Sequence, residues 1–352
     1  MKLEDIMAPI TVIFQQRVAE LIEVGDKGTV LFVIKNDALE SGDYRITEYE
    51  SAVFELEPEF HANTEQIEKD IKNIFGDGVK KVILAEYKTA FADLSNVIKN
   101  ELKWDWMFST EPEAQEDVVA LAKELEKFAF VYNNKADSMF VVSLANPSAI
   151  LDDDNDTKIT AEELLPYVVG VIAGCPYDKS ISYKIFTKFK SVELPTEIEK
   201  GQLILYNEEE GVRVASPVNT LTTTGENQTE DMKSVDITEG MQRMKTDLRY
   251  SFRTGYKGKY KNKYDNQSLY YGAAEYYLGQ LEEIGVLDPE YNNTIGVDIE
   301  ETRKLWIAQG KDAANWDDVT VKKTTYKNML IALADVKFLN AMEGMQLRVQ
   351  MF

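Results

Sequence analysis

The chain has 352 residues, of which 44% are hydrophobic, 11% aromatic and 28% charged. This is the composition of a globular protein of about two domains, and it excludes a disordered or collagen-like chain. The formal net charge of −22 disfavours general binding to nucleic acid or to an anionic membrane surface, because like charges repel.

The first part of the chain predicts strands. Residues 10–14 and 28–34 are rich in β-branched and aromatic side chains, and a turn-forming stretch at 25–28 separates them. Residues 43–54 form a third run in which polar and apolar residues alternate. We therefore expect a β-rich segment here.

From residue 79 onwards, segments whose apolar residues have the spacing of a strand alternate with segments whose apolar residues have the spacing of a helix. In the helix expected at 113–128, Val118, Leu121, Leu125 and Phe128 share one face. Strands are expected at 79–85, 104–108 and 139–144, and helices at 92–102, 113–128 and 160–173. Alternation at this spacing indicates crossover units, and so an α/β fold with a mainly parallel sheet and flanking helices.

Beyond residue 180 this rhythm ends. A hairpin is expected over 201–221, closed at 207–210, and a polar turn cluster follows at 222–228. Later elements are helices at 236–252 and 270–284, mixed structure at 299–309 and a final strand. We expect an N-terminal arm with a β-rich segment at 1–78, an α/β domain at 79–224 and an α+β domain at 225–352.

The counts of reactive side chains argue against an enzyme. The chain has one cysteine, Cys175, and one histidine, His61, so it can form neither an internal disulfide nor a thiolate zinc cage. His61 lies in an acidic stretch without a nucleophile motif and is expected to be a solvated surface residue. Neither a dinucleotide fingerprint nor a P-loop occurs, so no cofactor is expected. No signal peptide or membrane span is visible, which predicts synthesis in the cytoplasm.

An acidic stretch at 152–163 has the spacing of an EF-hand loop. Asp152, Asp154, Asp156 and Glu163 occupy loop positions 1, 3, 5 and 12. Against calcium binding, Thr157 replaces the glycine at position 6, and the preceding segment predicts a strand rather than a helix. The alternative is a capping box of Thr160 and Glu163 at the start of the next helix. No metal site is predicted, and the four carboxylates remain a weak calcium candidate.

A basic segment at 241–265 runs against the overall charge, with eight cations opposed by two carboxylates. Alternation with tyrosines is compatible with nucleic-acid stacking, but in so acidic a chain we favour a docking strip for an acidic protein partner over stacking or a solvated face. The cations are Arg243, Lys245, Arg249, Arg253, Lys257, Lys259, Lys261 and Lys263.

The C-terminus alternates apolar and polar residues from Met345 onwards, which is typical of a half-buried strand. Such a strand either pairs within its own domain or extends a sheet edge of a neighbouring subunit, and we favour the second. The residues of this inter-subunit strand are Gln346, Leu347, Arg348, Val349, Gln350 and Met351.

Three stretches resemble the contractile tail sheath proteins of phages and phage-tail-like bacteriocins. Residues 168–176 resemble a helix that ends in small residues, and 211–223 resemble the family's Gly-x-Arg-Val and Val-Asn-Thr-Leu-Thr hairpin. Residues 335–351, with Ala341-Met342-Glu343 before the alternating strand, are similar to its closing element. The resemblance covers roughly 79–352 and is nearest to the compact sheaths of R-type bacteriocins from Gram-positive bacteria, such as diffocin. The family's usual Arg-Pro-Gly-Val-Tyr opening is missing.

The resemblance implies a non-catalytic sheath domain with a subtilisin-like α/β fold and terminal strand arms. It implies hexameric rings that stack in a helical lattice around an inner tube protein and contract to drive the tube through a target envelope. The implied partners are further copies of the chain, the tube, and the baseplate and tail terminator proteins, with release as part of a phage tail or tail-like particle. The alternatives are an α/β enzyme and a calcium-binding interaction module.

Overall fold

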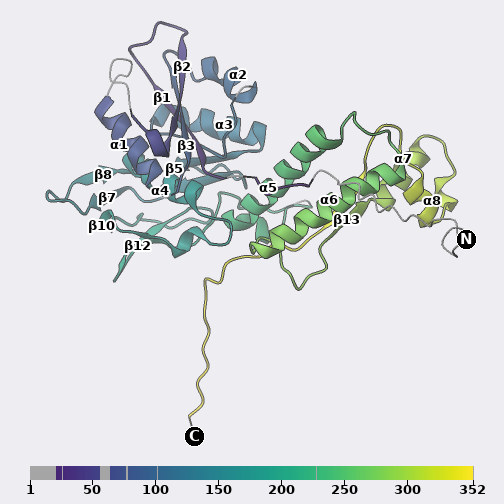
Figure 1. Ribbon diagram of the computed structural model, residues 1–352. Helices are drawn as coiled ribbons and strands as arrows, with labels where there is room; N and C mark the ends of the chain where they lie inside the picture. The colour runs from purple at the N-terminus through teal and green to yellow at the C-terminus, as the bar shows by residue number, and fades with distance from the viewer. Residues whose placement is uncertain are drawn as a thin grey trace, which may run out of the picture. The chain divides into compact units, whose positions relative to one another are not determined.

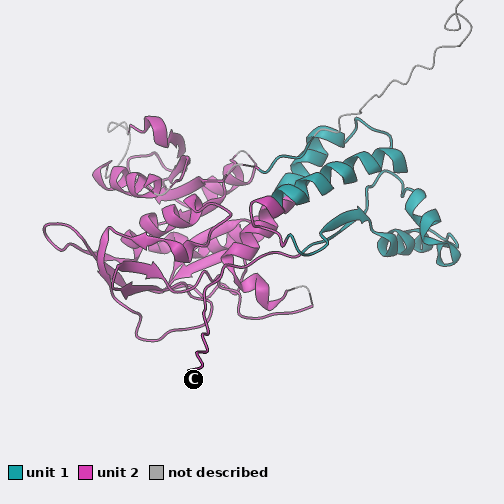
Figure 2. Ribbon diagram, turned by 60° about the horizontal axis from the view of Figure 1, so that its bottom comes forward, with its two compact units in different colours: residues 1–24, 246–281, 289–336 teal, residues 25–245, 282–288, 337–352 magenta. Residues whose placement is uncertain are grey.

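The computed structural model describes residues 21–25, 27–55, 64–76, 78–100, 102–226 and 228–351. The strand expected at 10–14 and His61 lie outside these residues. The chain divides into two compact units, coloured in Figure 2. Unit 2 consists of 25–245, 282–288 and 337–352, and unit 1 of 1–24, 246–281 and 289–336.

A six-stranded sheet forms the centre of unit 2, in the order β2-β3-β1-β4-β5-β6 (Figure 1). All neighbours are parallel except β2, which runs antiparallel to β3. The mainly parallel α/β fold predicted from the sequence is therefore confirmed. The strands are β1 (Thr29–Lys35), β2 (Tyr44–Glu50), β3 (Lys81–Tyr87), β4 (Trp106–Ser109), β5 (Phe128–Tyr132) and β6 (Val141–Leu144).

Helices cover both faces of this sheet. Along β1, Val30 and Phe32 belong to the core that α1 and α4 complete, whereas Leu31 and Val33 belong to the core beneath α2 and α3. This alternation explains why β1 reads as a continuous apolar run, since both of its faces are buried. The helices are α1 (Thr64–Phe75), α2 (Ala92–Asn100), α3 (Gln115–Leu125) and α4 (Ala161–Gly174).

Two helices of this unit differ from the sequence analysis. Helix α1 was not expected, and the helix predicted at 113–128 is too long at its C-terminal end. Glu126 adopts a left-handed conformation with φ of 51° and ends α3. Phe128 therefore begins β5, a strand that the prediction had merged into the helix.

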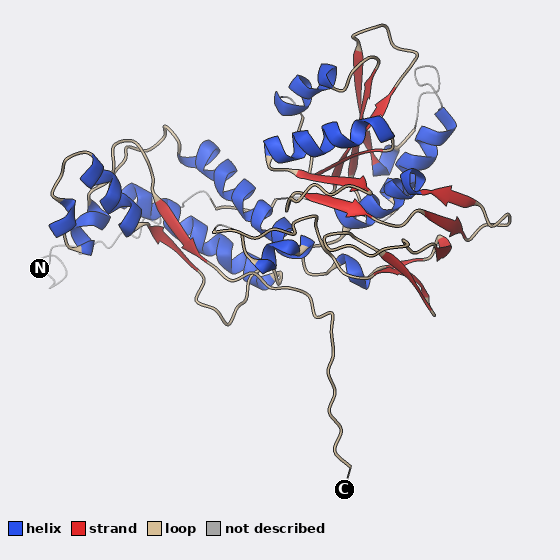
Figure 3. Cartoon of the chain, turned by 180° about the vertical axis from the view of Figure 1, so that it is seen from behind, coloured by secondary structure: helices blue, strands red, loops and turns tan. Residues whose placement is uncertain are grey.

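Two small sheets complete unit 2 (Figure 3). The predicted hairpin is confirmed: β11 (Leu205–Glu208) pairs with β12 (Gly211–Val214), and the pair Glu208 and Gly211 closes it. The remaining strands are β9 (Ile185–Phe186), which pairs with β12, and the sheet of β7 (Ser148–Leu151), β8 (Lys158–Thr160) and β10 (Phe189–Val192).

Unit 1 has a core of aromatic side chains. Tyr277 is fully buried on α6, and its hydroxyl donates a hydrogen bond to Asp247 at 2.8 Å. The residues expected to be of mixed structure form a regular helix, α7, whose cap is the Asp298 carboxylate. The elements are α6 (Tyr264–Glu283), β13 (Thr294–Val297), α7 (Ile299–Ala308), α8 (Asp318–Lys323), β14 (Ala332–Asp335) and the end of α5 (Val235–Ser251), followed by a π-helical turn (Phe252–Tyr256).

The compact units do not follow the boundaries expected at 78/79 and 224/225. Strand β1, expected in a separate N-terminal segment, lies between β3 and β4 in the central sheet. Helix α5 was assigned to the third segment, but its residues up to Lys245 belong to unit 2. Contacts between residues far apart in the sequence place β1 and the start of α5 in unit 2. No local sequence pattern predicts these contacts. Among the described helices, none is both long and apolar enough to cross a bilayer.

Candidate functional site

The C-terminal segment is the most exposed part of the described chain. Residues 341–351 belong to no strand of this chain, and Figure 1 shows them leaving unit 2 in an extended conformation. The exposed fractions of Met345, Leu347, Val349 and Met351 are 87%, 73%, 71% and 93%. The alternative of an edge strand within its own domain is therefore wrong, whereas pairing with a neighbour stays a prediction. We call residues 344–351 the tail.

The cations of the basic segment divide between the two units, and Lys263 on unit 1 forms an ion pair with Asp265 at 3.3 Å. Arg243 and Lys245 belong to unit 2: Arg243 hydrogen-bonds the hydroxyl of Tyr177, and Lys245 forms an ion pair with Glu126. These two cations therefore already have partners within unit 2. The other six are exposed on unit 1, and we call them the basic strip: Arg249, Arg253, Lys257, Lys259, Lys261 and Lys263.

The tyrosines of the basic segment do not form one stacking face. Tyr256 is buried and packs edge to face against Tyr270, with ring centroids 5.1 Å apart. Only Tyr250 and Tyr260 are largely exposed, at 56% and 43%. The alternation with cations thus reflects residues that face in and out of unit 1. The amide of Asn262 anchors the lysine-rich loop by donating to the carbonyls of 327 and 329, at 2.9 and 3.1 Å.

The acidic stretch is the turn of the β7–β8 hairpin. Strand β7 stands where an EF-hand has its incoming helix. Asp153 accepts hydrogen bonds from the side chain and backbone of Thr157 and the amide of Asn155, which lower the pKa of its carboxyl. Asp156 forms an ion pair with Lys190 at 2.7 Å.

The capping box at the start of α4 is confirmed. The Glu163 carboxylate accepts a hydrogen bond from the backbone amide of Thr160 at 2.9 Å, and the Thr160 side-chain oxygen accepts one from the backbone amide of Glu163. Asp152 and Asp154 are exposed at the hairpin turn. The structure therefore does not bring the four calcium candidates together, and no cluster of three metal-ligating side chains occurs within the described ranges.

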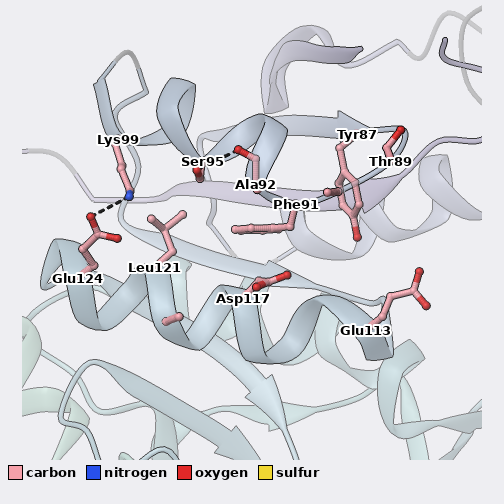
Figure 4. A pocket seen from close by; sticks show the side chains of 12 residues that line it. Tyr87, Thr89, Phe91, Ala92, Ser95, Lys99, Glu113, Asp117, Leu121 and Glu124 are labelled. Atoms are coloured by element: carbon pink, nitrogen blue, oxygen red, sulfur yellow. Dashed lines mark hydrogen bonds and ion pairs between the residues drawn. The ribbon is translucent and has the colours of Figure 1, made fainter. Parts of the chain in front are cut away.

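An open groove of about 450 Å³ lies between α2 and α3 (Figure 4). Phe91 and Leu121 supply apolar surface, and Asp117 and Glu124 supply carboxylates; Lys99 pairs with Glu124 at 2.7 Å. Burial, reinforced by Glu111, Glu113 and Asp117, raises the pKa of Tyr87 to about 12. The lining also includes the hydroxyls of Thr89 and Ser95, but the Ser95 hydroxyl donates to the backbone carbonyl of Ala92 at 3.0 Å and not to a base.

The cysteine is equally unsuited to nucleophilic chemistry. Cys175 is buried, and this burial raises the pKa of its thiol to about 12. Its sulfur lies 3.4 Å from the carbonyl oxygen of Lys179. A thiol that stays protonated is a poor nucleophile.

A short two-stranded sheet in unit 1 is a feature that the sequence analysis missed. Strand β13 pairs with β14, and Leu333 on β14 is 58% exposed. Each strand has four residues, too few for a period to be recognised beforehand. A two-stranded sheet is marginal on its own, and neither of these strands pairs with a third strand in the described part of the chain.

Comparisons with known proteins agree with this architecture. Residues 227–352 match the phage tail sheath C-terminal domain family. The tail sheath protein of Clostridium phage phiCD119 is 23% identical over 232 residues, and the match spans 64% of this chain and 64% of that relative, which is less than two thirds of its length.

Three solved structures similar to this chain are those of sheath proteins. The sheath of the extracellular contractile injection system PVC, contracted, has a TM-score of 0.68 and 12% identity, with 98% of this chain and 97% of that chain covered. The contracted sheath of the anti-feeding prophage has a TM-score of 0.65 and 15% identity, with 98% and 99% covered. The sheath tail protein of Desulfitobacterium hafniense has a TM-score of 0.64 and 12% identity, with 82% and 94% covered. The chain therefore has the fold of contractile tail sheath proteins, and its residues 227–352 are similar to the phage tail sheath C-terminal domain.

Proposed function

We propose that this chain is the repeating structural subunit of a contractile tail sheath. It polymerises as stacked hexameric rings around an inner tube and contracts to drive that tube through a target envelope. The observation that carries the proposal is the match of residues 227–352 to the sheath C-terminal domain. Its partners are further copies of itself, the tube protein, and the baseplate and terminator proteins at the two ends of the particle.

The tail provides the connection between subunits. Its four apolar side chains are exposed and its backbone has no partner strand within the described chain. Addition to a neighbour's sheet would satisfy the backbone and bury one row of side chains. We place the acceptor on the β13–β14 sheet of the neighbour, because a third strand would stabilise that sheet and cover Leu333.

The basic strip provides a second contact, either with the inner tube or with an acidic neighbouring subunit. Six exposed cations lie on one unit of a chain whose net charge is −22. One exposed ion pair contributes at most about 1 kcal/mol, but a tube repeats the contact in every subunit.

We infer that the chain has no catalytic role. The protonated Cys175 thiol and the acidic groove between α2 and α3 support this inference. An α/β enzyme would form a discrete oligomer, whereas a sheath subunit forms tubes. Negative-stain microscopy of the purified protein and of the native particle tests the proposal: long tubes of stacked rings are expected, and discrete oligomers alone would contradict it.

A further inference from the structure

A buried ion pair fixes the chain just before β1. Lys27 Nζ lies 2.6 Å from Glu239 Oε2, and their side chains are only 9% and 10% exposed. The indole of Trp106 donates to the other oxygen of Glu239 at 2.7 Å. The ammonium of Lys27 also lies over the ring of Tyr177, 5.1 Å from its centroid. Each charge is thus fully partnered, which is the condition for burying an ion pair without a large penalty.

The backbone next to Lys27 is held as well. The amides of Gly28 and Thr29 both donate to one carboxylate oxygen of Asp105 at 3.0 Å. The chain that precedes the central sheet therefore has a fixed point at Lys27, and the residue that fixes it lies on α5.

The other end of the chain attaches to the same helix. We call residues 337–343 the tail root. Phe338 packs so closely on Gly240 of α5 that a Cβ there would lie 3.1 Å from its ring. The side chain of Asn340 lies 3.0 Å from the Ser234 hydroxyl at the start of α5. Beyond this attachment the chain becomes exposed, and Met342 is 97% exposed.

A pair of backbone hydrogen bonds strengthens the tail root. The amide of Asp288 donates to the carbonyl of Lys337 at 2.8 Å, and the amide of Leu339 donates to the carbonyl of Val286 at 3.0 Å. The ammonium of Lys337 also pairs with the Asp288 carboxylate at 2.8 Å. The tail root is therefore held by backbone as well as by side chains, unlike the tail itself.

We infer that Ser234 and the first turns of α5, up to Gly240, form a joint to which the segment entering β1 at Lys27 and the tail root are both fixed, with Glu239 as its positioning residue. Both attachments lie within seven residues of one helix. Because a helix is stiff over this length, the joint holds the two ends at a constant spacing. In a sheath the joint would carry load between the connections of one subunit, and this part of the inference rests on the proposed function.

The isolated chain tests the joint itself. The variant Glu239→Gln keeps an acceptor for Trp106 and leaves Lys27 without a counter-charge. Trypsin cleavage after Lys27, a residue shielded in the parent, should then become at least tenfold faster, with the circular dichroism unchanged. Glu113→Gln, which breaks the exposed pair with Lys35, is the matched control and should leave cleavage after Lys27 unchanged. A cleavage rate equal to that of the parent in Glu239→Gln would overturn the assignment.

A disulfide across the tail root tests its role in the particle. In the double variant Ser234→Cys and Asn340→Cys, the new thiols replace side chains that already touch, while the buried Cys175 stays protonated. If the joint is permanent, oxidised and reduced particles should assemble and contract alike. Contraction that is blocked on oxidation and restored by reductant would show that the root must detach, and would overturn the inference. Absence of any sheath from the unsubstituted chain would contradict the proposed function and leave the trypsin result intact, whereas a sheath formed by the unsubstituted chain but not by the reduced double variant would show that the tail root is needed for assembly.

Discussion

The side-chain amide of Gln66 donates a hydrogen bond to the carboxylate of Asp70, 2.8 Å away and one turn further along α1. Asp70 is only 4% exposed. Burial raises the pKa of its carboxyl to about 7, although Gln66 and the charge of Lys69 oppose the shift; Glu163 adds to it. A carboxyl with this pKa makes the packing of α1 sensitive to pH.

We expect the replacement Asp70→Asn to stabilise the protein at pH 8 by on the order of 2 kcal/mol. The folded state holds the Asp70 proton more tightly than the unfolded chain, so the contribution of Asp70 to stability is fully present below about pH 4 and is lost as the pH rises through about 7. Urea unfolding at pH 4.5 and pH 8 measures the effect. The variant should lose this pH dependence, whereas Glu65→Gln, at an exposed site of the same helix, should keep it.

Gly170 sets the distance between α1 and α4. A Cβ at this position would lie 2.7 Å from the carbonyl oxygen of Ile74 and 3.0 Å from its Cα. Backbone atoms of a packed helix cannot move aside cheaply, so Gly170→Ala should destabilise the protein by about 2 kcal/mol or more. Alanine normally favours a helix by up to about 1 kcal/mol over glycine.

Gly272 provides the control for this replacement. It lies within α6, and apart from its own helix no atom comes within 4 Å of the place that a Cβ would take, so Gly272→Ala should raise the melting temperature. Calorimetry of both variants distinguishes the two cases, and equal shifts would refute the close approach of α1 and α4.

Deletion of residues 346–352 should leave the fold intact and abolish tube assembly. The side chains of residues 346–351 are exposed and contribute nothing to the core of unit 2. Melting temperature and negative-stain microscopy of the truncated chain measure the two effects. Normal contractile particles from this variant would exclude the tail as a connection between subunits.

Charge reversal in the basic strip should weaken assembly most strongly at low salt. The variant replaces Lys257, Lys259, Lys261 and Lys263 by Glu, which turns attraction to an acidic partner into repulsion that salt screens. The yield of extended particles over a range of salt concentrations is the measurement.

A control variant has the same net charge but leaves the basic strip unchanged. It carries four reversals at other exposed lysines, Lys103, Lys123, Lys200 and Lys322. Equal losses of yield in both variants would show that total charge, and not the basic strip, controls assembly.

The alternating strands and helices of the central sheet could be predicted because their apolar residues follow a strict period. Helix α1 carried the same signal in Ile67, Ile71 and Ile74 and could have been found. The end of α3 could not, because Glu126 adopts its left-handed conformation without the glycine that usually announces one.

The candidate surfaces were predictable to different degrees. The basic segment could be recognised in the sequence as a run of positive charges. The sequence could not show that Arg243 and Lys245 are paired within the chain, because these pairs depend on tertiary contacts. The alternation at the C-terminus indicated a strand but not its partner. A strand that pairs within its own chain and a strand donated to a neighbour show the same alternation of apolar and polar residues. The joint on α5 brings together residues more than 200 positions apart, such as Lys27 and Glu239, so no local sequence pattern could predict it.

The proposed pairing of the tail with the β13–β14 sheet of a neighbouring copy has a consequence for the length of the polymer. A donor strand and an acceptor edge at different places on one chain make a heterologous contact, in which every added copy offers a fresh acceptor or a fresh donor. A pair of copies does not satisfy both, so such contacts produce extended polymers instead of closed dimers. The final length of a tube built in this way has to be set by a component other than this chain, and subunits produced without that component should form tubes of widely varying length.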